Sequence, residues 1–454
     1  MARRWGDRPG TDRYDAVVIG AGPGGRAVAR ALAGERRRVA MVERELVGGE
    51  CPFWACIPTK TLLRPVELRS GARHFPGLAS PPAEWSEIAS YRDYMNSGLD
   101  DTDKTEAHER MGIEVIHADA RVAGPRLVAI EGRELETESI VVATGTSSAI
   151  PPLDGLEAVD YWTNREATAL REVPRSAIVL GGGPVGVELG QLLAGFGSEV
   201  TLVEAADRVL SHEEPELSEL FGRLLSRQLE LRLGTQAHGV ERAGREVRLT
   251  LDTGEELSAE RLVVAVGRKP RVDLGLENVA LEPDGGAIDV DERCRASDGV
   301  WAVGDVTGVA MFTHVASYQG RIAAGDMLGR EVRAEYRAIP RVVFSVPEVA
   351  AVGLTATQAA DRGLDTVAAH VELADLDRTE TYGRGLEGRV GAVADRGRGV
   401  LVGAWAVGPL ASEWIHVFVL AIKAEVPVEV LSDTVMQFPS FSEGVQAAAR
   451  ALRL

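Results

Sequence analysis

The sequence predicts an α/β protein in which one strand–helix–strand unit occurs twice. Each copy joins a short apolar strand to a glycine-rich turn, continues into a helical stretch and closes on a strand that ends in glutamate. The composition supports a folded chain, because 45% hydrophobic and 26% charged residues are ordinary values for globular proteins. A length of 454 residues suits two to four domains.

The first copy begins with a buried strand at residues 14–19 (YDAVVI), and its second strand, residues 38–42, ends at Glu43. Between the strands lie three glycines at the spacing GxGxxG, namely Gly20, Gly22 and Gly25. The first glycine permits the tight turn, the second lets the backbone approach a pyrophosphate, and the third allows close packing of helix on strand. This copy therefore predicts a dinucleotide site whose ribose contacts Glu43.

The second copy has its strands at residues 177–180 and 199–203, the latter ending at Glu204. Its glycines are Gly181, Gly183 and Gly186. The first glycine and the glutamate are 23 residues apart in both copies, and each copy is followed by a similar strand, VVATG ending at Gly145 and VVAVG ending at Gly267. One such motif is weak evidence, but two in matching context predict two Rossmann-like domains that bind two different dinucleotides.

Charge and cysteine content exclude several functions. A net charge of −18 without a Lys/Arg run disfavours nucleic acid and anionic membranes as partners. Three cysteines cannot form a secreted disulfide scaffold, and no apolar run is long enough for a signal peptide core or a membrane span. We therefore expect a cytoplasmic protein. No cluster of ligands predicts a metal site.

Cys51 and Cys56 lie five residues apart in GGECPFWACIPTK. On an ideal helix their Cα atoms would be about 8.6 Å apart, beyond the roughly 7 Å that a disulfide spans. The pair can bond only if the segment is distorted or enters a helix between them, and Pro58 suits an early position in a helix after Cys56. Two unlinked buried thiols are the alternative.

Together these motifs resemble the pyridine nucleotide–disulfide oxidoreductases, which include dihydrolipoamide dehydrogenase, glutathione reductase and mercuric reductase. The likeness covers nearly the whole chain. Gly304-Asp305, in WAVGDVTG, resembles the second FAD motif, and residues 339–355 resemble the start of the dimerisation domain. The resemblance implies an FAD domain at 1–147 and 270–335, an NAD(P) domain at 148–269 and an α+β dimerisation domain at 336–454 of a homodimer.

The resemblance also implies roles for matching residues. FAD would bind at Gly20, Gly22, Gly25, Glu43, Gly145, Gly304 and Asp305, and the nicotinamide nucleotide at Gly181, Gly183, Gly186 and Glu204. Cys56 would face the flavin as a thiolate, and Cys51 would attack the substrate. Lys60, one of only four lysines, and Glu188 resemble the ion pair beside the flavin. Glu204 predicts NADH rather than NADPH, because a carboxylate repels a 2′-phosphate, although the nearby Arg208 softens this.

The closing motif departs from the family pattern. Residues 438–443 read FPSFSE, so Phe438 stands where dihydrolipoamide dehydrogenase and glutathione reductase have a histidine held by the glutamate that matches Glu443. General acid/base catalysis of the kind that this histidine would supply typically increases a reaction rate 10²–10⁴-fold, which corresponds to a barrier lower by about 3–5 kcal/mol. A lipoamide substrate is therefore unlikely, and we expect a small-molecule acceptor that needs no proton: a low-pKa disulfide, a metal ion or a quinone-like compound.

Two rival interpretations remain open. Mercuric reductases also lack the His–Glu pair, but they use a C-terminal cysteine pair that this sequence does not have. The enzyme 2-ketopropyl-coenzyme M oxidoreductase/carboxylase carries the same Phe replacement, which makes reductive C–S cleavage or carboxylation an alternative. A redox sensor that keeps FAD without turnover is the other. The parts played by His314 and Trp54 stay open.

Overall fold

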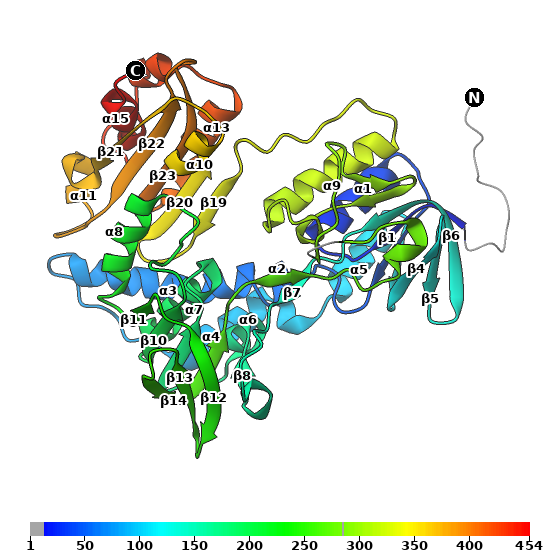
Figure 1. Cartoon of the computed structure of the whole chain (residues 1–454), viewed down its shortest axis with the longest axis horizontal. Helices are drawn as coiled ribbons and strands as arrows, with labels where there is room; N and C mark the ends of the chain where they lie inside the picture. Colours follow the sequence, from blue (N-terminus) through cyan, green and yellow to red (C-terminus); the bar gives the residue numbers. More distant parts are fainter. Residues whose placement is uncertain (1–12, 284–285) are drawn as a thin grey trace. The chain divides into compact units, whose positions relative to one another are not determined.

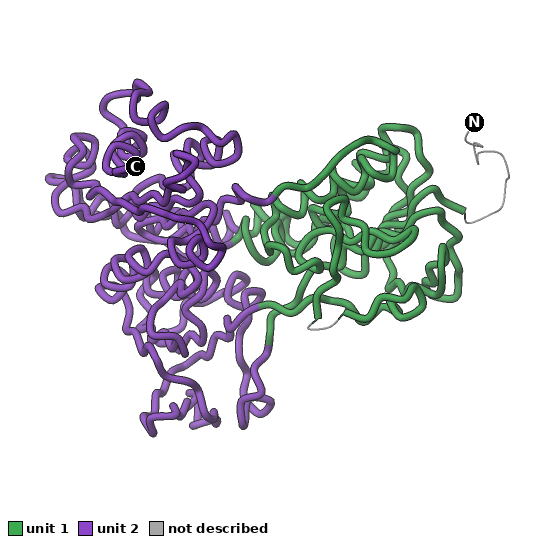
Figure 2. Tube along the Cα trace, turned by 45° about the horizontal axis from the view of Figure 1, so that its top comes forward, with its two compact units in different colours: residues 1–58, 93–149, 268–335 green, residues 59–92, 150–267, 336–454 purple. Residues whose placement is uncertain are grey.

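The computed structural model describes residues 13–283 and 286–454. They form two compact units, each assembled from separate stretches of the chain (Figure 2). Unit 1 contains residues up to 58, 93–149 and 268–335, and unit 2 contains residues 59–92, 150–267 and 336–454. The assignment of the three expected domain ranges to particular cofactors remains a prediction.

Unit 1 is built on a mostly parallel sheet with the strand order β17-β18-β6-β1-β2-β3, and a β4–β5 hairpin extends β6. Its strands are β1 (Arg13–Ile19), β2 (Val39–Glu43), β3 (Ile113–His117), β4 (Ala120–Gly124), β5 (Leu127–Ile130), β6 (Arg133–Val142), β17 (Arg295–Ser297) and β18 (Val300–Ala302). The apolar residues of β1 alternate between two cores, with Val17 on one face of the sheet and Val18 on the other.

Helices α1 (Pro23–Gly34) and α9 (Thr313–Met327) lie side by side on this sheet (Figure 1). Their contact is close, because a Cβ added to Gly320 would lie 2.6 Å from the Gly24 carbonyl oxygen. The remaining elements of unit 1 are α2 (Glu50–Phe53), α5 (Thr102–Glu109) and a small ladder of β7 (Thr146–Ser148) with β16 (Arg268–Pro270).

Unit 2 contains a second parallel sheet, β11-β10-β9-β15-β8, and a three-stranded antiparallel sheet, β12-β13-β14. The strands are β8 (Tyr161–Trp162), β9 (Ser176–Leu180), β10 (Glu199–Glu204), β11 (Glu230–Leu233), β12 (Ala237–Ala243), β13 (Glu246–Leu251), β14 (Glu256–Ala259) and β15 (Arg261–Val264). The helices are α3 (Cys56–His74) and α4 (Trp85–Met95), which both cross the unit boundary, and α6 (Asn164–Ala169), α7 (Pro184–Gly195) and α8 (Pro215–Leu225).

The C-terminal part of unit 2 is an antiparallel sheet, β19-β20-β23-β22-β21, with small helices. Its elements are β19 (Pro340–Val343), β20 (Glu348–Gly353), α10 (Ala356–Asp361), β21 (Thr366–Glu372), α11 (Asp377–Glu380), β22 (Arg389–Asp395), β23 (Val400–Gly408), α12 (Ala411–Trp414), α13 (His416–Lys423), α14 (Val428–Asp433) and α15 (Glu443–Ala451). This α+β part and the two parallel sheets confirm the predicted fold class.

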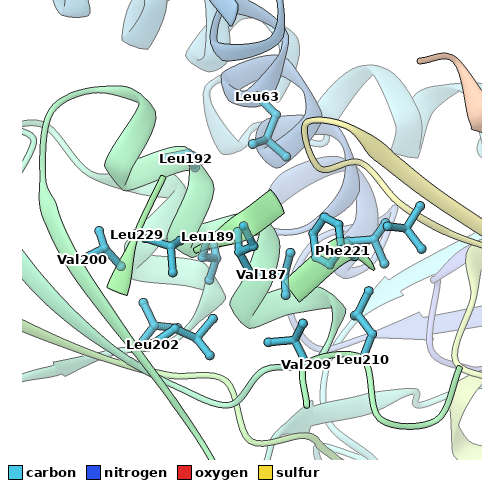
Figure 3. Packing of buried hydrophobic residues seen from close by; sticks show 14 of the residues in the cluster. Leu63, Val187, Leu189, Leu192, Val200, Leu202, Val209, Leu210, Phe221 and Leu229 are labelled. Carbon is cyan, nitrogen blue, oxygen red and sulfur yellow. The ribbon is translucent and has the colours of Figure 1, made fainter. Parts of the chain in front are cut away.

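One apolar core joins much of unit 2 (Figure 3). Val187 and Leu189 of α7 pack there with Phe221 of α8, and Leu63 brings α3 into the same cluster. Val343 of β19 belongs to it as well. This packing explains why residues 59–92 group with unit 2, although the sequence places them inside the first domain range.

The four strands expected in the two glycine motifs agree with the structure to within a residue or two, but the two strands that follow them differ, and the first of these, β6, begins at Arg133 instead of residue 141. The strands expected to end at Gly145 and Gly267 end earlier, at Val142 and Val264. Both glycines have positive φ, so the backbone turns out of the ladder before it reaches them. In the part of the chain that the structure describes, no helix is long and apolar enough to cross a membrane.

Candidate active site

The first glycine turn has the geometry that dinucleotide binding requires. Gly20 has φ +103°, and a Cβ added there would lie 2.3 Å from the Ala143 carbonyl oxygen. A Cβ at Gly25 would lie 2.0 Å from the Gly20 oxygen, so α1 can approach β1 only with glycine at this position. A Cβ added to Gly22 would meet nothing within 4 Å, and this glycine directly precedes α1, whose first residue is Pro23. Free space beside a helix N-terminus is the arrangement that can hold a phosphate.

The second turn, in unit 2, repeats these features. Gly181 has φ +106°, and a Cβ added there would lie 2.4 Å from the Ala265 carbonyl oxygen; a Cβ at Gly186 would lie 1.9 Å from the Gly181 oxygen. Gly183 again opens onto free space before α7, and Pro184 begins that helix. The duplication seen in the sequence is therefore also a duplication of the anion-binding geometry.

The two terminal glutamates have a structural task that the sequence did not reveal. Glu43 accepts hydrogen bonds from the backbone N–H groups of Ala21, at 2.8 Å, and Glu45, at 2.9 Å. Glu204 accepts from Gly182 and Ala206 in the same way. Each carboxylate is thus fixed beside its own glycine turn, and its remaining lone pairs are available to ribose hydroxyls.

A buried polar cluster surrounds the second FAD motif in unit 1. Asp305 accepts a hydrogen bond from the Thr146 hydroxyl at 3.2 Å, and Gly304 donates its N–H to Gln319 at 2.7 Å. Burial raises the pKa of the Asp305 carboxyl above its ordinary value, although Arg268 and Thr146 act in the opposite direction. Arg268 is not among the residues expected at this site from the sequence, and its signal there is a basic residue directly after the glycine that follows β15.

Arg268 and Arg271 also lie near Glu50, which precedes Cys51. Their guanidinium nitrogens are 3.7 and 3.8 Å from the Glu50 carboxylate oxygens. Arg271 is further anchored because its N–H donates to the Gly145 carbonyl at 3.0 Å. The redox segment is thereby connected to the loop that contains Gly145.

The chain does not form one continuous helix between the two cysteines, which meets the condition under which the sequence allows them to bond. Helix α2 contains Cys51 and ends at Phe53, and α3 begins at Cys56. Pro58 is accordingly the third residue of α3. The two cysteines are half-buried and are not joined in a disulfide in this structure. Their electrochemical pairing remains a prediction.

Cys56 lies at a position that stabilises a thiolate. It begins the long helix α3, where the helix dipole favours negative charge. Its Sγ is 3.6 Å from the Thr313 hydroxyl of α9, the helix that follows the second FAD motif. Cys56 is therefore on the side of the segment that faces this motif.

Lys60 and Glu188 form an ion pair in unit 2. The Lys60 Nζ is 2.6 Å from Glu188 Oε2, and the Glu188 side chain is only 7% exposed. The other oxygen, Oε1, accepts from the Phe344 N–H at 2.9 Å, and the Lys60 ammonium lies 5.0 Å from the centre of the Phe344 ring. The expected pair exists, and its place beside a flavin remains a prediction.

The closing motif presents a phenyl ring rather than an imidazole. Phe438 is 60% exposed, whereas Phe441 is buried against Tyr382 and Trp414. Glu443 begins α15 and accepts a hydrogen bond from the Ser440 N–H at 2.8 Å. Phe438 thus contributes an exposed apolar surface with no titratable group. Glu443 stabilises the loop before α15 through its hydrogen bond with Ser440.

Family comparisons agree with this geometry. Residues 14–320 match the model of the pyridine nucleotide-disulphide oxidoreductases, and residues 339–449 match the dimerisation domain of the same family. The chain belongs to this family. It is an NAD(P)H-dependent flavoprotein disulfide oxidoreductase, and its dimerisation domain indicates a homodimer.

Several family members are similar over almost their whole length. The chain is 34% identical to a dihydrolipoyl dehydrogenase of Thermus scotoductus over 97% of both proteins, and 34% identical to a mercuric reductase of Streptomyces lividans over 96% of both. Among solved structures, it resembles a Cu(II) complex of the HOCl-induced flavoprotein disulfide reductase RclA from Escherichia coli. That match has a TM-score of 0.85 and 27% identity, and covers 96% of this chain and 99% of the other.

A second similar structure is that of LpdA from Mycobacterium tuberculosis. It has a TM-score of 0.86 and 27% identity, and covers 96% of this chain and 99% of that protein. These relatives include different activities, so the family alone does not identify the electron acceptor of this oxidoreductase.

Proposed function

We propose that this oxidoreductase transfers electrons from NADH through FAD to a Cys51–Cys56 disulfide, and from the resulting dithiol to an acceptor that needs no proton from a histidine. When bound, FAD supplies a ring that accepts hydride from the nicotinamide and delivers electrons to the disulfide. The observation that carries the proposal is Phe438: its ring is exposed and cannot donate a proton.

The chain has the features needed to hold both cofactors. The open space at Gly22 and Gly183, each at the start of a twelve-residue helix, fits two pyrophosphates. The FAD set would be Gly20, Gly22, Gly25, Glu43, Gly145, Gly304 and Asp305, and the nicotinamide set Gly181, Gly183, Gly186 and Glu204. Lys60 and Glu188 would fix a charge pair beside the nicotinamide.

The two cysteines would then have different roles in the transfer of electrons to the acceptor. Reduction of the Cys51–Cys56 bond gives two sulfurs, of which Cys56 remains near the Thr313 hydroxyl. With a disulfide acceptor, Cys51 Sγ attacks one acceptor sulfur and the other leaves as a thiolate. Cys56 Sγ next attacks Cys51 Sγ, which restores the Cys51–Cys56 bond and releases the second thiolate. Neither departing thiolate receives a proton from Phe438, so acceptors that leave as stable anions are favoured.

Metal ions fit the same requirement, because a reduced metal ion needs no proton. Two of the similar proteins support this class by name: a mercuric reductase and a reductase in complex with Cu(II). The described residues contain no group of three or more His, Cys, Asp or Glu side chains that could hold a metal ion. The metal would thus be a substrate at the cysteines.

The test is a rapid-mixing experiment. The enzyme is reduced with NADH without oxygen and then mixed with an aromatic disulfide of low thiol pKa, a Cu(II) or Hg(II) salt, or a benzoquinone. We expect at least one of these to reoxidise the flavin at catalytic rates. A flavin that NADH does not reduce would contradict the proposal and favour a sensor, and so would a reduced enzyme that none of the three acceptors reoxidises.

We expect NADH to be preferred to NADPH. Glu204 is fixed beside the second turn, and Arg208 is occupied locally, since it donates to the Ser211 carbonyl at 3.0 Å and to Asp207 at 3.1 Å. The ratio of kcat/KM for flavin reduction should favour NADH by at least about tenfold, equivalent to 1.4 kcal/mol. A preference for NADPH would refute the assignment.

We also expect each active site to need both chains, with residues 438–443 facing the partner's flavin. Exposed apolar side chains occur in this segment and just before it in the sequence, namely Val430, Val435 and Phe438, and Val435 is 92% exposed. Val435→Glu should therefore leave the isolated chain folded but place an uncompensated charge in the interface, which costs several kcal/mol. Light scattering should show monomers that have lost most turnover.

Met111→Glu is the matched control, because Met111 is an exposed apolar residue of unit 1, 51% exposed. This variant should remain dimeric and active. A Val435→Glu monomer with full activity would show that one chain is sufficient.

A further inference from the structure

An unpaired cation lies beside the segment that carries Cys51. Arg26 is in the first turn of α1, and its guanidinium donates through Nη2 to the Gly48 carbonyl at 3.4 Å. Its Nε is buried and has no hydrogen-bond partner among the residues that the structure describes. No carboxylate within the described ranges pairs with it either. Buried charges are normally paired, so this guanidinium calls for an anionic partner.

The backbone brings the start of the segment that carries Cys51 to the first turn of α1. Gly48 is three residues before Cys51, and a Cβ added to Gly49 would lie 2.8 Å from the Gly22 Cα. The start of the redox segment is thus packed against the first turn of α1. Burial lowers the pKa of the Arg26 guanidinium, Arg30 lowers it further, and Cys51 raises it. Of these three effects, only the interaction with Cys51 favours the charged guanidinium.

We propose that Arg26 holds Cys51 as a thiolate and so makes the sulfur nucleophilic at neutral pH without a histidine. The inference rests on the proposed role of Cys51 as the thiol that attacks the acceptor. It makes Arg26 a positioning and charge-stabilising residue. It also explains how the chain tolerates Phe438, because a fixed positive charge replaces the base that would otherwise deprotonate the thiol.

The other charged groups of unit 1 near this segment are already engaged. Arg30, one turn further along α1, donates through Nε to His108 at 3.1 Å, and burial lowers the pKa of that histidine. Glu50 lies near Arg268 and Arg271.

Two further charged side chains of unit 1 lie at the start of α5. Lys104 lies 4.5 Å from the centre of the Phe53 ring and donates to Ser97 at 3.5 Å. Asp101, just before that helix, accepts from the Val47 N–H. Arg26 remains as the cation whose Nε is not occupied.

The test measures the pKa of the Cys51 thiol in the FAD-loaded, full-length enzyme. Cys56→Ser makes Cys51 the single cysteine of the redox segment. Alkylation by iodoacetamide is followed against pH at the level of individual peptides, and the buried Cys294 serves as the internal reference. With Arg26 present, the midpoint should lie below the ordinary cysteine value of about 8.5.

Arg26→Gln in this background should raise the midpoint by about one pH unit, because a nearby opposite charge typically shifts a pKa by one to three units. Alkylation at pH 7 should fall roughly tenfold, while rates well above the midpoint should agree. Arg26→Lys keeps a positive charge and should recover most of the rate. Arg30→Gln is the matched control: its guanidinium is bound to His108, so its removal should shift the midpoint much less.

An unshifted midpoint in Arg26→Gln, or an equal shift in Arg30→Gln, would overturn the inference. Bound FAD absorbance confirms that each variant is folded, and Arg26→Lys gives a second measurement if the Gln variant is not. The proposed function is tested separately by the electrons that wild type takes up from NADH. If wild type takes up only the electrons that the flavin accepts, the redox disulfide and with it the proposed function are refuted. If wild type takes up the electrons that both the flavin and the disulfide accept, the proposed function stands whatever the Arg26 result.

Discussion

Cys51→Ser should show a long-wavelength charge-transfer band before any reductant is added, and Cys56→Ser should show none even when reduced. Only the sulfur next to the flavin can donate into its ring. Cys56 begins α3 and contacts Thr313 of the helix that follows the second FAD motif. Cys51 instead lies in α2, three residues after Gly48, which accepts a hydrogen bond from Arg26 of α1. Without Cys51 to bond with, Cys56 should remain a thiolate beside oxidised flavin.

The measurement is an absorbance spectrum of each variant, with and without NADH. Cys294→Ser is the control, since Cys294 is fully buried in the core of unit 1 and should leave the wild-type spectrum unchanged. The reversed pattern, with the band present in Cys56→Ser and absent in Cys51→Ser, would exchange the two roles.

Wild type should reduce lipoamide far more slowly than NADH reduces its flavin, so that reduced enzyme accumulates. An alkyl thiol has a pKa near or above 8.5 and leaves poorly without a proton. Phe438→His should increase this turnover, because an imidazole with a pKa near 6.5 can donate one. Since Phe438 is largely exposed, the change should not disturb the fold of its own chain.

The gain should stay below the full 10²–10⁴-fold of general acid catalysis, because the new side chain is not positioned by its surroundings. Glu443→Gln in the Phe438→His background is the control, and it should remove part of the gain if the carboxylate orients the imidazole. Wild-type turnover of lipoamide at roughly 10 s⁻¹ or more would mean that another group supplies the proton.

Local patterns in the sequence predicted the parts of the site that depend on neighbours in the chain. The glycine turns follow from steric needs of single positions, and the break between Cys51 and Cys56 follows from helix geometry. The ion pair of Lys60 with Glu188 came from the family resemblance, and the structure contains it.

What the sequence did not predict depends on contacts between distant segments. Arg26 and Gly48 are brought together by folding, as are Arg268 and Glu50. The backbone contacts of Glu43 and Glu204 were missed for a different reason. The expected contact with a ribose already accounted for a glutamate at each position. A carboxylate has enough lone pairs to accept hydrogen bonds from both a ribose and the backbone.

Buried side chains of helix α7 link its part of unit 2 to residues 336–454. Besides Glu188, which accepts from Phe344, the buried Gln191 accepts from the Val346 N–H at 2.9 Å and donates to its carbonyl at 3.0 Å. Without residues 336–454, Glu188 would keep Lys60 and Gln191 would keep Gln228, but the second oxygen of Glu188 and the amide oxygen of Gln191 would lose their N–H donors, at about 1–3 kcal/mol each. The part of unit 2 that contains β9 and α7 therefore looks modular by its fold, yet its buried polar side chains depend on residues 336–454 for their hydrogen bonds.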